Sequence, residues 1–194
     1  MVKTAMILPA AGSSRRHPPN KLLLDLEGRT VIERAVGVFL GRNLELILVL
    51  GYQQERVRRV LEREFGGAVR IVVNPEYASG MASSLRRGLL AAGEGFDYYA
   101  VSLGDKPFIR PETVDRLLET LERDRPLLLA PEYGGRTGHP VFFRADLLGE
   151  LLSLEGETGG REVIRRHRDA AHLLPVEDEG VMLDMDGYLE RAGE

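Results

Sequence analysis

A loop near the start of the chain combines very small residues with positive charges. Ala10, Ala11 and Gly12 leave room for a ligand to approach their backbone N–H groups, and Arg16 and Lys21 follow shortly afterwards. This combination suits a polyphosphate, because backbone amides and a lysine can cradle it while an arginine binds it with two parallel hydrogen bonds. A basic turn in solvent would have the same composition, so the loop alone leaves both interpretations open. Further hydroxyl groups in the loop come from Ser13 and Ser14.

Carboxylates stand in two later segments. Asp105 follows an apolar run in the segment LGDKP, and Asp184 and Asp186 follow another in LDMDG. Magnesium usually binds one or two protein carboxylates together with substrate phosphates, so these residues are candidate metal ligands. Asp184 and Asp186 would share one face of a strand, because side chains two positions apart point the same way. The alternatives are a Gly-Asp turn at Asp105 and a helix N-cap at Asp186.

Two further segments offer groups for a nucleoside and for a second substrate. In NPEYASGMASS, Gly80 lets the chain come close to a flat ligand, and nearby serines offer hydroxyl groups at the start of a helix. Helix capping by Ser79 would explain the same pattern. The segment Gly138-His139-Pro140 carries a lone histidine, a residue that is more often structural than catalytic. The residues of the first segment that suit ribose or base recognition are Asn74, Ser79, Gly80, Ser83 and Ser84.

The composition excludes several kinds of chemistry. The chain has 194 residues, no cysteine, four histidines and a net charge of −4. The lack of cysteine excludes disulfides, zinc–thiolate sites, iron–sulfur clusters and a cysteine nucleophile. The negative charge argues against nucleic-acid binding. No apolar run has the length of a transmembrane helix or the pattern of a secretory signal, so we expect a cytoplasmic protein without membrane contact.

The elements that must position these residues alternate between short apolar runs and amphipathic runs, a pattern that predicts a parallel sheet covered by helices. The runs Thr4–Leu8 and Leu44–Leu50 are apolar without alternation, which indicates central strands buried on both faces. Thr30 and Glu33 have the spacing of a capping box at the start of a helix. Further strands are expected at 69–73, 98–103, 127–130, 140–144, 172–175 and 181–183, and helices at 31–42, 53–65, 82–92, 111–123, 145–152, 160–167 and from about 186.

We therefore expect a single α/β domain over residues 1–194, with a doubly wound, mostly parallel sheet. In such sheets, ligands bind beyond the C-terminal ends of the strands. The loops after Leu8, Val73 and Leu103 and the segment near the last strand then meet in one crevice. These loops carry the small, cationic and acidic residues described above.

Taken together, the motifs resemble those of the MobA-like nucleotidyltransferases, and most of all the molybdenum cofactor cytidylyltransferase branch. The resembling segments follow in the family's order and cover nearly the whole chain: LPAAGSSRRHPPNK, NPEYASGMASSLRRGL, LGDKP, GHPVFF, GETGGREVI and LDMDGYLE. The resemblance implies a Rossmann-like fold of the nucleotide-diphospho-sugar transferase type. It also implies an NTP substrate, Mg²⁺ as cofactor, release of pyrophosphate and transient contact with a molybdoenzyme.

The resemblance assigns roles to individual residues. Arg16, Lys21 and Asp105 match catalytic positions, and Gly12 matches the glycine of the phosphate loop. Asp105 matches the metal aspartate, and the late Asp-x-Asp is expected to supply a second ligand. The nucleobase side is matched by Gly80, Ser83 and Ser84, and the acceptor side by Gly138, His139 and Pro140, with Lys106 close to them.

The chain departs from the family pattern at several positions. His17-Pro18 replaces Met-Gly, Pro9 replaces a threonine or leucine beside the base, and Lys106 replaces a glutamine beside the acceptor. Glu157 stands where an aspartate is usual, and Gly187-Tyr188 replaces Thr-Pro. These changes bear on the choice of acceptor and base more than on the phosphate chemistry.

These observations lead to the hypothesis that the protein moves an NMP, CMP from CTP, onto a phosphate-bearing small molecule such as molybdopterin or the molybdenum cofactor. Ala11 favours CTP, because cytidylyl members resemble this chain there while guanylyl members often have glycine. Alternatives are guanylyl transfer to molybdopterin, transfer to a sugar or alcohol phosphate, and a nucleotide-binding regulator without turnover. A Rossmann oxidoreductase is not favoured, because residues 9–14 lack the glycine fingerprint.

Overall fold

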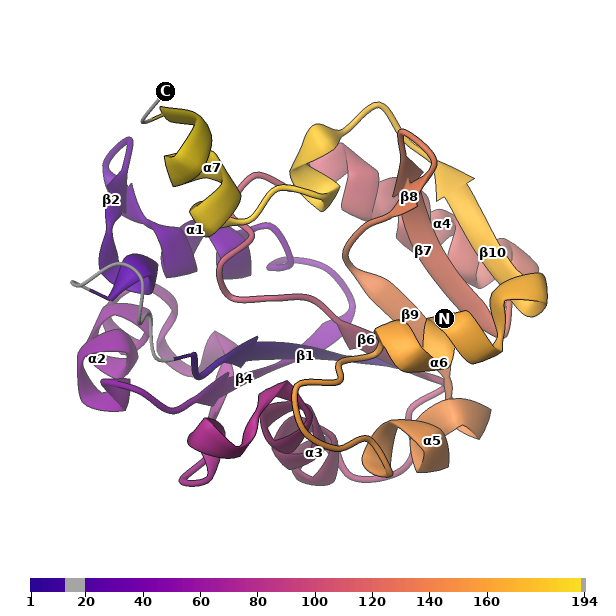
Figure 1. Ribbon diagram of the computed structural model, residues 1–194, viewed down its shortest axis with the longest axis horizontal. Coiled ribbons are helices and arrows are strands. Elements are labelled where there is room, and N and C mark those ends of the chain that lie inside the picture. The colour runs from indigo at the N-terminus through magenta and orange to yellow at the C-terminus, as the bar shows by residue number, and fades with distance from the viewer. Residues whose placement is uncertain (13–19, 193–194) are drawn as a thin grey trace.

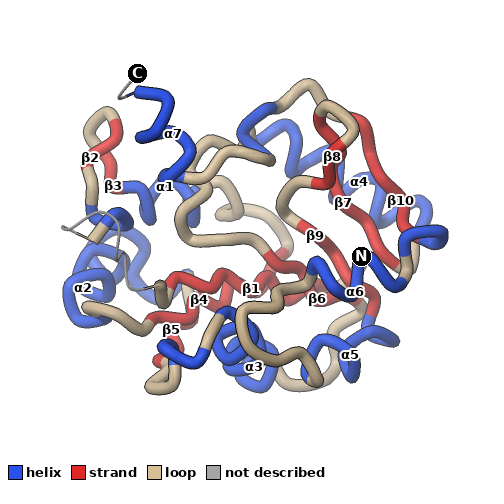
Figure 2. The backbone as a smooth tube through the Cα atoms, viewed as in Figure 1, coloured by secondary structure: helices blue, strands red, loops and turns tan. Residues whose placement is uncertain are grey.

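The computed structural model describes residues 1–12 and 20–192. Its centre is an eight-stranded sheet with the order β10-β7-β9-β6-β1-β4-β5, and β8 pairs with β7 at its side. Figure 2 shows β4, β1 and β6 next to one another, with β7 and β10 toward one end. The strands are β1 (Thr4–Ala10), β4 (Leu44–Leu50), β5 (Arg70–Val73), β6 (Tyr98–Val101), β7 (Leu128–Tyr133), β8 (Arg136–Thr137), β9 (Val141–Arg144) and β10 (Ala171–Pro175), and β2 (Asp25–Leu26) and β3 (Arg29–Thr30) form a separate hairpin.

The sheet is mostly parallel, as the sequence predicts. β1 pairs in parallel with both β4 and β6, β4 with β5, and β7 with β10. β9 is antiparallel to both of its neighbours, β6 and β7. The chain therefore enters β9 at the edge where β1 and β6 end. This reversal brings the segment before β9 to the same edge as the loops that follow the parallel strands.

Helices cover both faces of the sheet (Figure 1). Successive residues of one strand point to opposite faces, so Met6 and Leu8 pack in one core and Ala5 and Ile7 in the other. α1, α2, α4 and α7 contribute to the first core, and α3, α5 and α6 to the second. The helices are α1 (Val31–Gly37), α2 (Gln54–Phe65), α3 (Met81–Ala92), α4 (Pro111–Asp124), α5 (Leu148–Leu152), α6 (Arg161–Arg166) and α7 (Met185–Ala192).

The first helix begins as the sequence predicts and ends earlier. The Thr30 side chain accepts a hydrogen bond from the Glu33 N–H, and the Glu33 carboxylate accepts one from the Thr30 N–H, which makes a full capping box. The helix ends at Gly37 rather than at 42. The Arg42 guanidinium donates to the carbonyls of Val38 and Leu40, at 2.7 and 3.3 Å, and so satisfies backbone groups that a longer helix would have paired internally.

Two local predictions are wrong. The expected strand at 181–183 is absent, because a short 3₁₀ helix occupies Glu179–Val181 and leads directly into α7. Asp184 and Asp186 therefore do not share a strand face: Asp184 accepts a hydrogen bond from the Gly187 N–H at 2.8 Å, in the manner of an N-cap, and Asp186 lies in the first helical turn. The alternative interpretation, in which Ser79 caps α3, does not hold either, since Gly80 is the N-cap residue.

No helix among the described residues is long and apolar enough to cross a membrane.

Candidate functional site

Three predicted residues from distant parts of the chain meet in one charge cluster. The Lys21 ammonium lies 2.7 Å from a carboxylate oxygen of Asp105 and 2.9 Å from one of Asp186. The backbone N–H of Met185 donates to the Asp105 carbonyl at 2.8 Å, which joins the start of α7 to the loop after β6. Burial lowers the pKa of Lys21, but the charges of Asp105 and Asp186 and their hydrogen bonds outweigh it, so the pKa is raised and the ammonium form is favoured.

Local packing explains why these loops lie so close together. A Cβ on Gly104 would stand 2.6 Å from the Cβ of Ala10, and the Gly104 N–H donates to the Pro9 carbonyl at 3.0 Å. Only a residue without a side chain permits this approach between the end of β1 and the loop after β6. On the other side, Asn20 caps the short 3₁₀ helix Lys21–Leu23 by accepting from the Leu22 N–H, which fixes the backbone that carries Lys21.

The donor set around Lys21 fits a divalent cation. The second carboxylate oxygen of Asp105, Oδ1, is buried and accepts no hydrogen bond from the described residues. Two carboxylates already surround one positive charge, which is the protein contribution that magnesium usually takes alongside substrate phosphates. Within residues 1–12 and 20–192, no group of three or more acidic or histidine side chains could hold a metal by itself. A metal here would therefore need further ligands from outside the protein, such as phosphate oxygens or water.

A first cavity of about 410 Å³ lies beside the end of β1. Its apolar wall includes Pro9, Met81, Leu85 and Leu103, and its other wall is the segment 157–162. The size and the mixed lining suit part of a nucleoside. Pro9, expected beside the base, thus lies on a cavity wall.

A second cavity of about 680 Å³ adjoins the first, and both are lined by His139 and Arg161. Lys106, Gly138 and Asp184 line the second cavity as well. The residues expected on the acceptor side therefore gather around one space, with the exception that Pro140 is buried and lines neither cavity. Lys106 is 5% exposed and donates to the Met182 carbonyl at 2.8 Å.

His139 is held as a neutral imidazole. Burial lowers its pKa to about 4, and the positive charge of Lys106 acts in the same direction. Its Nδ1 lies 3.3 Å from the Val101 carbonyl, and its backbone N–H donates to the Val181 carbonyl at 2.9 Å. A Cβ on Gly138 would stand 2.5 Å from the Val181 side chain, so the glycine is required for this packing. An Nδ1–H that donates to Val101 leaves Nε2 as an acceptor.

The start of α3 is shaped by internal contacts. The buried Asn74 amide donates to the hydroxyls of Ser83 and Ser84, at 2.9 and 3.0 Å. The Gly80 φ is +114°, and a Cβ there would stand 2.3 Å from the Gly156 carbonyl oxygen. Gly80 is thus needed for close approach, as predicted, but what approaches is the chain itself. These contacts hold the wall of the first cavity in place, and they are made by residues predicted to bind the nucleoside.

Only part of the predicted phosphate-binding loop lies within the described residues. Ala10 packs against Gly104, and the Ala11 carbonyl accepts from the Tyr52 N–H at 3.3 Å. A Cβ on Gly12 would meet no atom of the described residues within 4 Å, and Gly12 is exposed among them, as a ligand-facing backbone requires. Three of the residues predicted to bind phosphate lie outside the described residues: Ser13, Ser14 and Arg16.

The sequence did not single out the arginines of the second cavity. Arg136 comes from β8, Arg161 and Arg165 from α6, and Arg168 from the 3₁₀ helix Arg168–Ala170. The density of arginine in REVIRRHR is the signal that could have indicated them. Arg136 stands far from that segment in the sequence, so only the β7–β8 hairpin brings it near.

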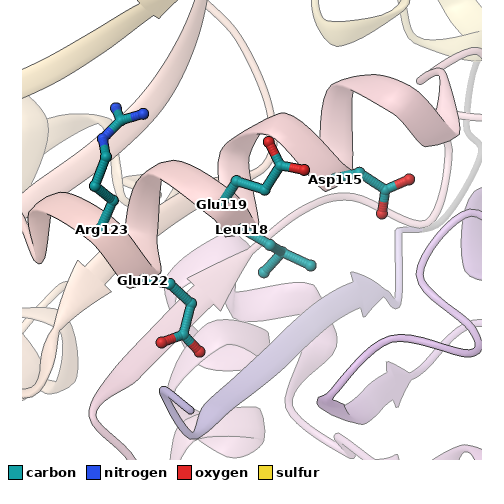
Figure 3. Close-up of a pocket in the computed structure, with 5 residues that line it drawn as sticks. All are labelled: Asp115, Leu118, Glu119, Glu122 and Arg123. Atoms are coloured by element: carbon teal, nitrogen blue, oxygen red, sulfur yellow. The ribbon is translucent and has the colours of Figure 1, made fainter.

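A further hollow, of about 620 Å³, lies along the outer side of α4. Figure 3 shows its five lining residues, which all belong to this helix and include three carboxylates. Two of the acids are already engaged: Asp115 pairs with Arg42, and Glu122 accepts from the Val2 N–H. None of the predicted site residues lines this hollow, so it is separate from the charge cluster.

Comparisons with known proteins agree with this arrangement. The family described as MobA-like NTP transferase domain matches residues 5–171. A nicotine blue oxidoreductase of Paenarthrobacter nicotinovorans is 31% identical over 94% of this chain and 91% of its own length. A probable molybdenum cofactor guanylyltransferase of Methanosarcina acetivorans is 30% identical over 60% of this chain and 52% of its own.

Solved structures support the same assignment. Rv0371c from Mycobacterium tuberculosis H37Rv superposes with a TM-score of 0.83 at 26% identity, covering 99% of this chain and 96% of the other. A nucleotidyl transferase from Methanothermobacter thermautotrophicus superposes with a TM-score of 0.78 at 26% identity, covering 97% and 95%. Because the family model matches most of its length, this chain belongs to the MobA-like NTP transferase family.

Proposed function

We propose that this nucleotidyltransferase moves an NMP, CMP from CTP, onto a phosphate-bearing small molecule, molybdopterin or the molybdenum cofactor, with release of pyrophosphate and with Mg²⁺. The observation that carries the proposal is the contact of Lys21 with both Asp105 and Asp186 at the edge where β1 and β6 end. A phosphate-loop cation and the candidate metal ligands, distant in sequence, lie within one ion-pair network. Two cavities adjoin the same edge and offer room for a donor and an acceptor.

The reaction is an in-line displacement. An oxygen of the acceptor phosphate attacks the α-phosphorus, the bond from that phosphorus to the oxygen bridging to the β-phosphate breaks, and pyrophosphate leaves. Asp105 and Asp186 would hold the magnesium ion, which when bound neutralises charge on the phosphate oxygens. Lys21 stabilises negative charge on the leaving pyrophosphate, and Arg16 is expected to assist. The chain contributes position and charge rather than a covalent intermediate.

The choice of CTP rests on the family resemblance at position 11, beside the cavity at the end of β1. Ala11 and Pro9 precede the open backbone of Gly12, and Pro9 lines the first cavity. Ala11 favours cytosine, because cytidylyl members resemble this chain at that position while guanylyl members often have glycine. The guanylyltransferase among the relatives makes GTP the alternative donor. A sugar or alcohol phosphate is the alternative acceptor.

A nucleotide panel tests the proposal. Thermal unfolding is measured with CTP, GTP, ATP or UTP, each with Mg²⁺ at the same concentration, because a ligand that binds only the folded state raises Tm by mass action. Pyrophosphate release is then measured with each nucleotide, with and without molybdopterin. CTP should give the largest rise in Tm, and pyrophosphate should appear only when molybdopterin is added. Release that is fastest with GTP would overturn the base assignment, and nucleotide binding without release under any condition would favour a regulator.

The relation to nicotine blue oxidoreductase favours one second candidate, a redox reaction on the same fold. The similarity to this relative covers almost the whole chain, so a redox reaction in place of nucleotidyl transfer has to be tested. Oxidation of NADH or NADPH is followed by absorbance with quinone and azo dyes as electron acceptors. Turnover comparable to pyrophosphate release would support the redox candidate, and no turnover above the uncatalysed rate would remove it.

A further inference from the structure

Lys106 is a buried cation that has no carboxylate partner among the residues that the structure describes. Its side chain lines the second cavity and is 5% exposed, and its ammonium donates to one neutral group, the Met182 carbonyl. Among the described residues, no carboxylate forms an ion pair with it within 4.0 Å, whereas Lys21 has two. An unpaired buried charge is unfavourable, so the site is completed by an anion.

A second group of cations stands at the rim of the same cavity. Arg136, Arg161 and Arg168 are exposed and come from three separate elements. None of them forms an ion pair with any residue in the described ranges, while Arg165 and Arg166 nearby are both paired with Glu162. The cavity's acids are Glu132 and Asp184. Positive charge therefore exceeds negative charge around this space.

The cavity that carries both cationic groups also has an apolar lining. Its apolar residues are Val141, Phe143, Ile164, Leu173 and Val181. A small inorganic anion would satisfy one group and leave the other without a partner. A molecule with an apolar or flat body and an anion at each end would satisfy both groups and cover the apolar wall.

We propose that the second cavity selects an acceptor with two anionic groups: the attacking phosphate, held by Lys106, and a second anion, held by Arg136, Arg161 and Arg168. This inference rests on the proposed function, because it specifies the acceptor of the same reaction. Lys106 directly follows Asp105, so a phosphate bound to it lies next to the candidate metal ligands. The rim arginines then set specificity rather than reactivity.

The test measures the affinities of two matched probes by isothermal titration calorimetry, without nucleotide or metal. Phenyl phosphate carries one anionic group, and 4-carboxyphenyl phosphate carries a second at the far end of the same ring. The wild-type protein should bind the second probe at least tenfold more tightly at fixed salt. Lys106→Gln should weaken both probes at least tenfold and keep their ratio. The combined change Arg136→Gln, Arg161→Gln and Arg168→Gln should weaken only 4-carboxyphenyl phosphate, to the level of phenyl phosphate.

Control variants separate binding from folding. Arg56→Gln removes an exposed arginine of α2 that lines neither cavity, and it should leave both affinities within twofold. Lys106→Met should unfold at the same Tm as the wild type or higher, because an unpaired buried charge has been removed. A structural lysine would instead lower Tm when replaced. Equal wild-type affinity for the two probes, or unchanged affinities in Lys106→Gln, would overturn the inference.

The two proposals fail separately. Pyrophosphate release without any preference between the probes would refute the acceptor inference and leave the transferase intact. The expected probe preference without pyrophosphate release from any nucleotide would instead refute the proposed function and leave the anion-binding cavity.

Discussion

At the scale of single residues, the central feature is one ammonium shared by two acids. Lys21 and Asp186 are 165 positions apart in the chain, yet their side chains form a hydrogen bond of 2.9 Å. The ammonium stands at a position suited to a cation between two carboxylates. When a magnesium–triphosphate occupies the site, the same ammonium would shift its partnership toward phosphate oxygens. We therefore expect Lys21 to have an anionic partner both with and without bound nucleotide.

Replacing Lys21 by Met should affect both catalysis and stability. Transition-state stabilisation should fall by about 3 kcal/mol, the scale of one lost contact to a developing negative charge. The Asp105 and Asp186 carboxylates would then repel each other without a counter-ion, which should lower Tm in the absence of metal. Steady-state kinetics and thermal unfolding measure the two effects. Wild-type turnover in Lys21→Met would remove Lys21 from the site.

His139 should make stability depend on pH. The folded protein holds its pKa at about 4, first because of burial and then because of the Lys106 charge, with Arg161 and Asp184 also nearby, whereas an unfolded histidine titrates near 6.5. Below pH 6.5 the unfolded state binds the proton and the folded state does not, so stability falls as the pH decreases toward 4.

The expected loss from this group is at most about 2 kcal/mol between pH 7 and pH 5. His139→Gln has no proton to bind, so its stability should change less over the same range. Urea unfolding at both pH values measures the difference, with His172→Gln, a partly exposed histidine, as control. Identical pH dependence in wild type and His139→Gln would show that this imidazole is not held neutral.

At the scale of elements, glycines decide how closely the loops of the site approach. Gly104 allows the loop after β6 to touch the end of β1, and Gly80 allows the start of α3 to touch Gly156. The second contact is reinforced by a hydrogen bond of 3.0 Å from the Ala82 N–H to the Gly156 carbonyl. The segment 157–162, which lines the first cavity, is therefore held in place through α3.

Gly80→Ala should destabilise the protein and disturb the first cavity. The φ of +114° is unfavourable for alanine, and its Cβ would stand 2.3 Å from a backbone oxygen. We expect a loss of about 2 kcal/mol or more and weaker nucleotide binding. Gly149→Ala is the matched control, because that glycine lies in α5, has an ordinary φ and would meet nothing within 4 Å. Equal stability of the two variants would contradict the strained-contact account.

At the scale of the whole molecule, the site lies where parallel strands end. β1 and β6 are neighbours in register, and the loops that follow them carry Gly12 and Asp105. The reversed direction of β9 adds Gly138 and His139 to the same edge. α7 then closes the arrangement from the far end of the chain, through the Met185 N–H and Asp186. One sheet edge thus brings together the residues that we propose for the donor, the metal and the acceptor.

Much of this architecture could be predicted from the sequence. Continuous apolar runs such as Leu44–Leu50 mark buried central strands, and the observed β4 has those bounds. The apolar run 181–183 led to a wrong prediction of a strand. Gly180 packs against the Phe108 backbone, where a Cβ would stand 1.9 Å from the carbonyl oxygen, so the chain turns there instead of extending. Short apolar runs do not reveal such tertiary contacts.

The site was predictable only in part, for a similar reason. Lys21, Asp105 and Asp186 stand in compact motifs, and the structure brings them together. Arg136 and Arg161 stand in no motif with each other, and they meet only because β8 and α6 border one cavity. The strand order that produces this meeting depends on pairing between distant segments, which no local pattern encodes.

The most direct test of the account is pyrophosphate release by Asp105→Ala, measured with CTP, Mg²⁺ and molybdopterin. The matched control is Asp146→Asn, an exposed acid just beyond the end of β9, at the opposite edge of the sheet. The account predicts that Asp105→Ala folds like the wild type and releases no pyrophosphate above background, while Asp146→Asn releases it at the wild-type rate. Near wild-type release by Asp105→Ala would contradict it.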